Sequence, residues 1–218
     1  TSTLRMIAGH ESVSSGDVIF GNANVTDLPP ASRGTAMMFQ SYALFPHLSV
    51  ADNIGYGLKR EGLPRAEIDR RVAEMLALVK LDGLGKRRPD QLSGGQRQRV
   101  MIAMSIACEP AMLIADEPTT ALDVTVQAQI LKLLDELKTR MNMGMLFITH
   151  DFGVVADIAD DVVVMFRGEI VEYGPVANVL GNPQHPYTQA LLDCVPDADG
   201  KKPLKPIDYA WLTNGAHP

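Results

Sequence analysis

The sequence predicts an α/β fold in which helices flank a parallel β-sheet. Apolar runs at residues 34–39, 111–115 and 145–149 have the composition of buried strands, and the run 111–115 is apolar throughout, as a strand covered on both faces should be. Between these runs, apolar residues recur at helical spacings of three and four, within 51–80 and again within 123–141. Alternating strands and helices are typical of an α/β architecture.

The composition is that of a globular protein with room for a substantial core. The chain has 218 residues, of which 46% are hydrophobic and 21% are charged. Its formal net charge of −6 gives no support for a nucleic-acid surface, because proteins that bind phosphate backbones usually carry a basic excess. Nucleic acid is therefore not among the expected partners.

Neither cysteine chemistry nor a membrane span is indicated. Cys108 and Cys194 form no zinc-type spacing and no disulfide framework. The most apolar helical stretch, 101–108, is far shorter than the ~20 residues that a membrane span needs, and no signal peptide is visible. We therefore expect a cytosolic protein that partners can hold at a membrane.

The first third of the chain predicts one helix and two strands. Residues 1–9 are expected to be helical, 17–20 form a short strand, and Gln40 directly follows the strand at 34–39. A lone glutamine at such a place is usually a loop hydrogen-bonder, so on these residues alone its role stays open.

A glycine-rich helix start follows the predicted loop 81–91. Ser93, Gly94 and Gly95 offer unpaired backbone N–H groups, the positive end of a helix dipole and no side-chain bulk, which together suit the terminal phosphate of a nucleotide. For these three residues alone, an ordinary N-cap with tight helix packing is the alternative.

Two carboxylates stand where the strand 111–115 ends. The two carboxylates can have different roles there: Asp116 can bind a magnesium ion, and Glu117 can act on an attacking water. Taken alone, an acidic pair after an apolar strand is more often a solvated strand end. Asp123 is expected to cap the helix that runs to about Met141, and the N-cap role is sufficient to explain it.

The strand 145–149 ends at His150, and a single histidine at a strand end is usually structural. Further on, residues 162–166 and 169–173 predict a hairpin with a two-residue turn at Arg167-Gly168.

The joint pattern resembles the ATP-binding subunit of an importer-type ABC transporter. Leu92 to Gln96 matches the signature run, Ile114 to Glu117 matches the end of the Walker B strand, and 119–123 matches the D-loop. The resemblance implies a RecA-like P-loop NTPase core with a parallel sheet, an inserted helical subdomain and a remnant antiparallel β layer. By this resemblance, 1–52 and 109–180 form the ATP-binding core, 53–108 the helical signature subdomain, and 181–218 a C-terminal tail.

The resemblance also assigns site residues, with ATP and Mg²⁺ as the expected cofactors. Gln40 takes the Q-loop position, which contacts magnesium and the water, and His150 takes the switch position, which donates to the terminal phosphate and orients Glu117. The catalytic set implied is Glu117, His150 and Gln40; the ATP-binding set is Thr1, Ser2, Ser93, Gly94, Gly95, Gln96 and Asp123; the metal set is Thr1, Gln40 and Asp116.

The phosphate-binding loop is the motif that these residues do not contain. In the pattern G-x-x-x-x-G-K-[ST], the match of 1–9 to the family's first helix puts Thr1 at the final hydroxyl position, so the glycines and the lysine fall before it. Gly85-Lys86 is no substitute, because Arg87 stands where a hydroxyl is needed. We therefore expect the chain as given to bind ATP poorly.

The two halves of the chain resemble different branches of the importer ATPases. Residues from about Arg33 to Arg99 look like sugar, polyamine or iron importer ATPases, whereas those from about Met101 to Leu192 look like oligopeptide and dipeptide importer ATPases, including the tail motif at 183–188. The expected function is therefore to power an ABC importer for peptides or another small solute.

The implied partners are a second ATP-binding subunit, in a homo- or heterodimer, transmembrane permease subunits and, indirectly, a substrate-binding protein. The chain is expected to be peripheral to the cytoplasmic side of the cell membrane. The alternatives left open are a catalytically impaired fragment that only dimerises, and a soluble ABC ATPase acting on nucleic acid or ribosomes.

Overall fold

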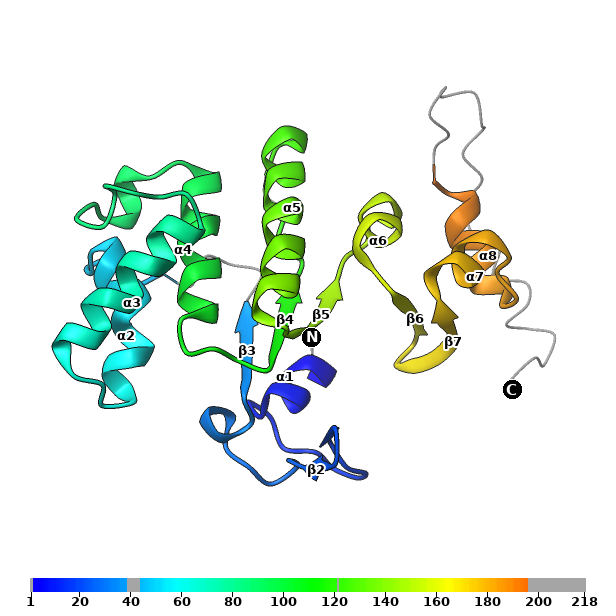
Figure 1. The fold of residues 1–218 in the computed structure, drawn as a ribbon. Coiled ribbons are helices and arrows are strands. Elements are labelled where there is room, and N and C mark those ends of the chain that lie inside the picture. The colour runs from blue at the N-terminus through cyan, green and yellow to red at the C-terminus, as the bar shows by residue number, and fades with distance from the viewer. Residues whose placement is uncertain (1, 39–43, 121, 196–218) are drawn as a thin grey trace. The chain divides into compact units, whose positions relative to one another are not determined.

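The computed structural model describes residues 2–38, 44–120 and 122–195, and the chain divides into two compact units, 1–148 and 149–218. The centre of the first unit is a parallel sheet with the order β3-β4-β5, formed by Thr35–Met38, Met112–Asp116 and Gly144–Ile148 (Figure 1). Met38 pairs with Ala115 and Asp116 pairs with Ile148, so the carboxyl ends of all three strands meet at one edge. The predicted parallel α/β sheet is confirmed.

Alternate residues of β4 belong to two different cores. Ile114 is buried against Leu4 and Ala8 of helix α1 (Ser2–Ala8) on one face of the sheet. Leu113, on the other face, joins a larger core that includes helix α5 (Val124–Met141). Because side chains alternate along a strand, the apolar run at 111–115 is what lets helices cover both faces.

Arg33 holds the carboxyl end of α1. Its guanidinium is 7% exposed and donates to four carbonyl oxygens: those of Met6 at 2.8 Å, Ile7 at 3.0 Å, Thr26 at 2.6 Å and Leu28 at 2.8 Å. A cation at this helix end also complements the helix dipole. Arg33 thereby ties α1 to the loop that leads into β3.

An antiparallel hairpin of two very short strands, β1 (Ile19–Phe20) and β2 (Ala23–Asn24), precedes this loop, which contains a 3₁₀ turn at Pro30–Ser32. The strand predicted at 17–20 is therefore present only in its second half.

The predicted helical stretch 51–80 is two helices, α2 (Val50–Arg60) and α3 (Arg65–Leu78). The break follows from two residues, since Gly62 adopts a left-handed φ of 80° and Pro64 is the N-cap of α3. A loop with a 3₁₀ turn at Pro89–Gln91 then leads into α4 (Gly94–Ile106). The apolar sides of α2, α3 and α4 share the larger core with β4 and α5.

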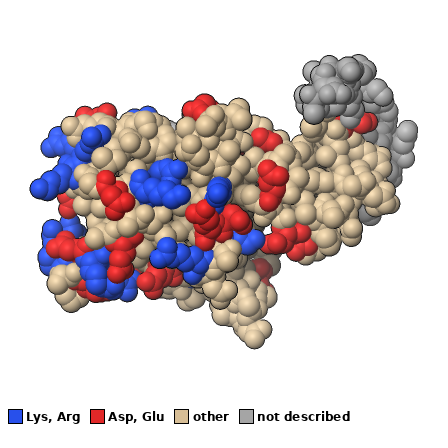
Figure 2. All heavy atoms as spheres, turned by 45° about the horizontal axis from the view of Figure 1, so that its top comes forward, with Lys and Arg blue, Asp and Glu red and all other residues tan. Residues whose placement is uncertain are grey.

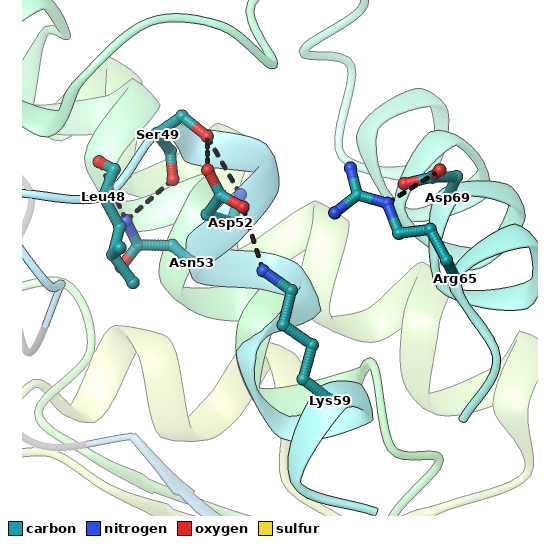
Figure 3. A network of polar contacts seen from close by, with 7 residues as sticks. All are labelled: Leu48, Ser49, Asp52, Asn53, Lys59, Arg65 and Asp69. Atoms are coloured by element: carbon teal, nitrogen blue, oxygen red, sulfur yellow. Dashed lines mark hydrogen bonds and ion pairs between the residues drawn. The ribbon is translucent and has the colours of Figure 1, made fainter. Parts of the chain in front are cut away.

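The start of α2 is held by its own N-cap, which Figure 3 shows, and by the loop that precedes α4. Ser49 is the N-cap and its hydroxyl accepts from the Asp52 N–H at 3.1 Å. The N–H groups of Val50 and Ala51 donate to carbonyl oxygens at 87 and 85, so the loop before α4 satisfies amides that no helix residue can reach.

Asn53 is fully buried and organises the chain just before α2. Its side-chain oxygen accepts from the Phe45 N–H at 2.8 Å, and its amide nitrogen donates to the carbonyl oxygens of Phe45 (3.1 Å), Leu48 (3.4 Å) and Ser49 (2.9 Å). A single amide thus replaces the hydrogen bonds that a regular element would give to residues 45–49.

Charges of both signs mix on the surface. Figure 2 shows Lys and Arg interspersed with Asp and Glu over the helices of the first unit. On α3, Glu67 accepts from both Arg70 and Arg71, which lowers the pKa of the Glu67 carboxyl to about 2. These are exposed pairs, so each contributes little to stability.

The second unit contains α6 (Phe152–Ile158), the antiparallel pair β6 (Asp161–Phe166) and β7 (Glu169–Pro175), α7 (Val176–Gly181) and α8 (Pro186–Asp193). Arg167 and Gly168 have φ values of 53° and 89°, which is the positive-φ pair of a tight hairpin turn. The predicted hairpin and its two-residue turn are confirmed.

The tail motif at 183–188 is a helix cap. Glu172 of β7 accepts from the backbone N–H groups of Gln184 at 2.7 Å and His185 at 3.1 Å. His185 is the N-cap of α8 and its Nδ1 accepts from the Tyr187 N–H at 3.1 Å. The motif therefore joins the hairpin to α8.

Replacing Arg33 by methionine is expected to lower the free energy of unfolding of the first unit by about 3 kcal/mol or more, because four carbonyl oxygens lose a charged donor. Equilibrium urea unfolding measures the change. Arg5→Met is the matched control, since Arg5 makes only a half-exposed ion pair with Glu11 and its loss should cost less than about 1 kcal/mol. Equal effects of the two substitutions would contradict this role of Arg33.

Asn53→Leu, which keeps the branched shape but not the amide, is expected to cost about 2–4 kcal/mol in the same unfolding measurement, because the backbone groups of 45–49 lose their partners. Asn53→Asp should be no milder, since a carboxylate would face three carbonyl oxygens. Lys59→Met removes only an exposed ion pair with Asp52 and serves as the control. A change below about 0.5 kcal/mol for Asn53→Leu would refute the assignment.

Candidate active site

Asp116 is the last residue of β4 and is 9% exposed. Residues two apart in a strand point to the same face, so Asp116 shares the face of Ile114, which is the face that α1 covers. A carboxylate at the carboxyl edge of a parallel sheet lies where α/β folds bind their ligands. Its oxygens are the hard ligands that Mg²⁺ prefers, so this position fits the predicted metal role.

Glu117 turns the chain sharply at that edge. Its φ is 48°, a left-handed conformation that is uncommon for a residue with a side chain. Its N–H donates to the Ile148 carbonyl oxygen at 3.0 Å, which extends the pairing of β4 with β5 by one residue. Its carboxylate is half-buried and accepts from the Thr120 hydroxyl at 2.9 Å. Backbone strain of this kind is concentrated at functional sites.

The helix start at Ser93 forms a complete capping box. The Ser93 hydroxyl accepts from the Gln96 N–H at 3.3 Å, and the Gln96 side-chain oxygen accepts from the Ser93 N–H at 3.0 Å. Within the described part of the chain, the N–H groups of Gly94 and Gly95 have no protein acceptor. These two amides are available to an anion at the positive end of the helix dipole.

Asp123 caps α5 in the same way. Its Oδ1 accepts from the Val126 N–H at 2.9 Å, and the residue itself is exposed. The predicted N-cap role is confirmed. The first turns of α4 and α5 lie against each other, because the Val126 side chain occupies the space beside Gly95. The structure thus brings the signature run and the predicted D-loop residue together.

The remaining predicted site residues are placed as follows. Ser2 is the exposed first residue of α1. Thr1 and Gln40 lie outside the described residues. His150 belongs to the second unit, where it directly precedes Asp151, the N-cap of α6. The roles of all these residues stay predictions.

Among the described residues, no group of three or more His, Cys, Asp or Glu is arranged to hold a metal ion. The predicted metal set has only Asp116 in those ranges, so Mg²⁺ binding stays a prediction. A search of the described helices finds none with both the length and the apolar character needed to cross a membrane.

Sequence reasoning missed two residues that shape this region. Val126 was one of several apolar residues in a helical period, and its position facing a glycine of another helix leaves no local signal. Asn53 stands at the start of the predicted helical insertion 53–108, where polar residues are common. An asparagine among apolar positions of a helix could have marked it as buried and hydrogen-bonded.

Comparison with known families gives two matches. The model of the ABC transporter family matches residues 1–120, and the model of the oligopeptide/dipeptide transporter C-terminal region matches 171–210.

Curated relatives are import ATP-binding proteins. The chain is 44% identical over 196 residues to the sulfate/thiosulfate import ATP-binding protein CysA of Halalkalibacterium halodurans, covering 88% of this chain and 55% of the relative. It is 41% identical to the spermidine/putrescine import ATP-binding protein PotA of Thermotoga maritima (88% and 52%) and 49% identical to the glutathione import ATP-binding protein GsiA of Escherichia coli K12 (80% and 28%). The chain spans about half the length of the first two relatives, and less of the third.

A solved structure shares the fold. The dimeric structure of the ATP-binding cassette MJ0796 in a post-hydrolysis state, bound to ADP and Pi, superimposes with a TM-score of 0.71 and 28% identity, covering 80% of this chain and 79% of that one. With a family model matching more than half of its residues, the chain belongs to the ABC transporter family.

Proposed function

We propose that this chain supplies the ATP-binding and ATP-hydrolysing machinery of an importer. The observation that carries the proposal is the placement of Asp116 and Glu117 in sequence at the carboxyl edge of a parallel sheet, with Glu117 held there in a strained conformation. Relatives named as import ATP-binding proteins support the transport role.

In this proposal Glu117 accepts the proton of the attacking water. The backbone of Glu117 is fixed by its N–H, which donates to the Ile148 carbonyl oxygen, and its carboxylate accepts from the Thr120 hydroxyl, which limits the orientations that the side chain takes. Asp116 would hold Mg²⁺, which when bound would supply positive charge against the charge that develops on the outer phosphates. Thr1 and Gln40 complete the metal set, and Ser2 contacts the phosphates.

The nucleotide lies between two subunits. The amides of Gly94 and Gly95, together with Ser93 and Gln96, meet nucleotide that is held by the other subunit, and Asp123 contacts that subunit. The partner is a second ATP-binding subunit, in a homodimer or a heterodimer, and the dimeric form of the structural relative supports this arrangement. His150 takes the switch position, which donates to the terminal phosphate.

Closure of the dimer drives permease subunits, which hold the chain peripheral to the cytoplasmic side of the membrane. A substrate-binding protein acts indirectly. The helical segment 53–108 presents the signature run, flanked by the ATP-binding core at 1–52 and 109–180, and 181–218 forms the tail. The solute is a peptide or another small molecule; the match at 171–210 to the oligopeptide/dipeptide C-terminal region favours the peptide branch.

Glu117→Gln is expected to lower kcat for ATP hydrolysis by about 100-fold or more while leaving ATP binding intact, because the amide cannot accept the proton. Hydrolysis is measured in the protein that carries these residues, assembled with its permease subunits. Glu136→Gln, an exposed change on α5, is the control and should keep the wild-type rate.

Wild-type turnover in the Glu117→Gln variant would remove Glu117 from the catalytic role. A wild-type protein that dimerises but hydrolyses no ATP would instead show the non-catalytic alternative, and hydrolysis stimulated only by nucleic acid or ribosomes would point to the soluble class.

A further inference from the structure

The backbone conformation of Gly95 does not require a glycine, so the reason for a glycine at this position lies in its neighbours. It lies in the first turn of α4 with a helical conformation, and it is absent from the glycines with positive φ among the described residues. A Cβ added at Gly95 would lie 2.7 Å from Cγ1 of Val126, 3.8 Å from its Cγ2 and 3.9 Å from its Cβ. The first distance is far inside van der Waals contact, so a side chain at 95 and the valine cannot both keep their places.

Val126 cannot easily turn away. It is the third residue of α5, and a β-branched side chain in a helix has one strongly preferred χ1 rotamer. Its backbone is also fixed, because its N–H donates to the Asp123 carboxylate at 2.9 Å. The Cγ1 methyl of Val126 therefore limits sterically how closely the first turn of α4 can approach α5.

The two caps are joined through this contact. On one side, Gly95 stands between Ser93 and Gln96, the two partners of the capping box. On the other side, Val126 carries the amide that Asp123 caps. One turn further along both helices, Arg99 donates to the Gln129 side-chain oxygen at 3.4 Å, so α4 and α5 also meet there.

We propose that Val126 is a positioning residue that sets the spacing between the signature turn and the D-loop turn, and that Gly95 is glycine because Val126 fills its side-chain space. Ser93 and Asp123 then face a partner subunit as one unit of fixed geometry. This inference rests on the proposed function for its effect on ATP hydrolysis, whereas the fit of Gly95 to Val126 is a property of the fold alone.

A variant cycle tests the proposal with Gly95→Ala, Val126→Ala and the double variant, in the protein that carries these residues. Thermal unfolding reports the fit, and kcat and KM for ATP hydrolysis report the position of the signature turn. Val124→Ala combined with Gly95→Ala is the matched control, because Val124 is also in the first turn of α5 but is 84% exposed and makes no contact with Gly95.

Gly95→Ala alone is expected to lower the midpoint of thermal unfolding and to reduce kcat by about one to two orders of magnitude, because the first turn of α4 must shift. In the Val126→Ala background the same change should raise the midpoint, since alanine is the better helix former, and should restore most of kcat. Val124→Ala should restore neither.

Three results would overturn the proposal: Gly95→Ala raising the midpoint in the wild-type background, the double variant failing to recover kcat, or Val124→Ala rescuing as well as Val126→Ala. Failure of the double variant to recover kcat would mean that the nucleotide itself needs the space at Gly95. A wild-type protein without ATP hydrolysis would overturn the proposed function, and the unfolding midpoints would still decide whether Val126 requires a glycine at 95.

Discussion

The parallel pairing of β4 with β5 is the constraint on which the candidate site depends. The ladder ends with Asp116 opposite Ile148, and the Glu117 N–H adds one more hydrogen bond to the Ile148 carbonyl oxygen. A slip of one residue would turn Asp116 and Ile114 to the opposite face, away from α1. The apolar contacts of Ile114 with Leu4 and of Leu113 with the α5 side oppose such a slip. The burial pattern of one strand therefore fixes where the carboxylates emerge.

The signature run depends on a second kind of interaction, the hydrogen bonds that side chains accept from free backbone N–H groups at the starts of helices. Ser49, Ser93 and Asp123 each accept a backbone N–H at the start of α2, α4 and α5. At α2, the loop carbonyls at 85 and 87 serve two further amides, so the segment that leads into α4 is tied to α2 before the signature begins. Asn53 extends this order backwards to Phe45. The helical segment is thus held by polar contacts at its ends and by apolar packing along its length.

Local patterns were enough to predict the three strands of the parallel sheet, the β6-β7 hairpin, the caps and the acidic pair, but only half of β1 and not β2. The run 111–115 could be assigned to a buried strand because it is apolar throughout, and Asp123 could be assigned to a cap because its side-chain chemistry acts within three residues. The contacts of Val126 with Gly95 and of Arg33 with Met6 join residues far apart in the chain, and nothing near either residue in sequence marks them. The break between α2 and α3 was visible in Gly62 and Pro64 but was outweighed by the helical period on either side. The roles of Thr1, Gln40 and His150 came from family resemblance, and they stay predictions.

In the proposed dimer each nucleotide site is completed by the second subunit, and subunit complementation measures this sharing in a dimer of two copies. Ser93→Asp keeps an N-cap acceptor but sets a carboxylate against the phosphates, and Glu117→Gln removes the proton acceptor. The two inactive variants are coexpressed with different tags and the mixed dimers are isolated. We expect mixed dimers to regain ATP hydrolysis, since one of their two sites combines an intact Ser93 with an intact Glu117. Mixed dimers as inactive as either parent would contradict a site shared between two copies.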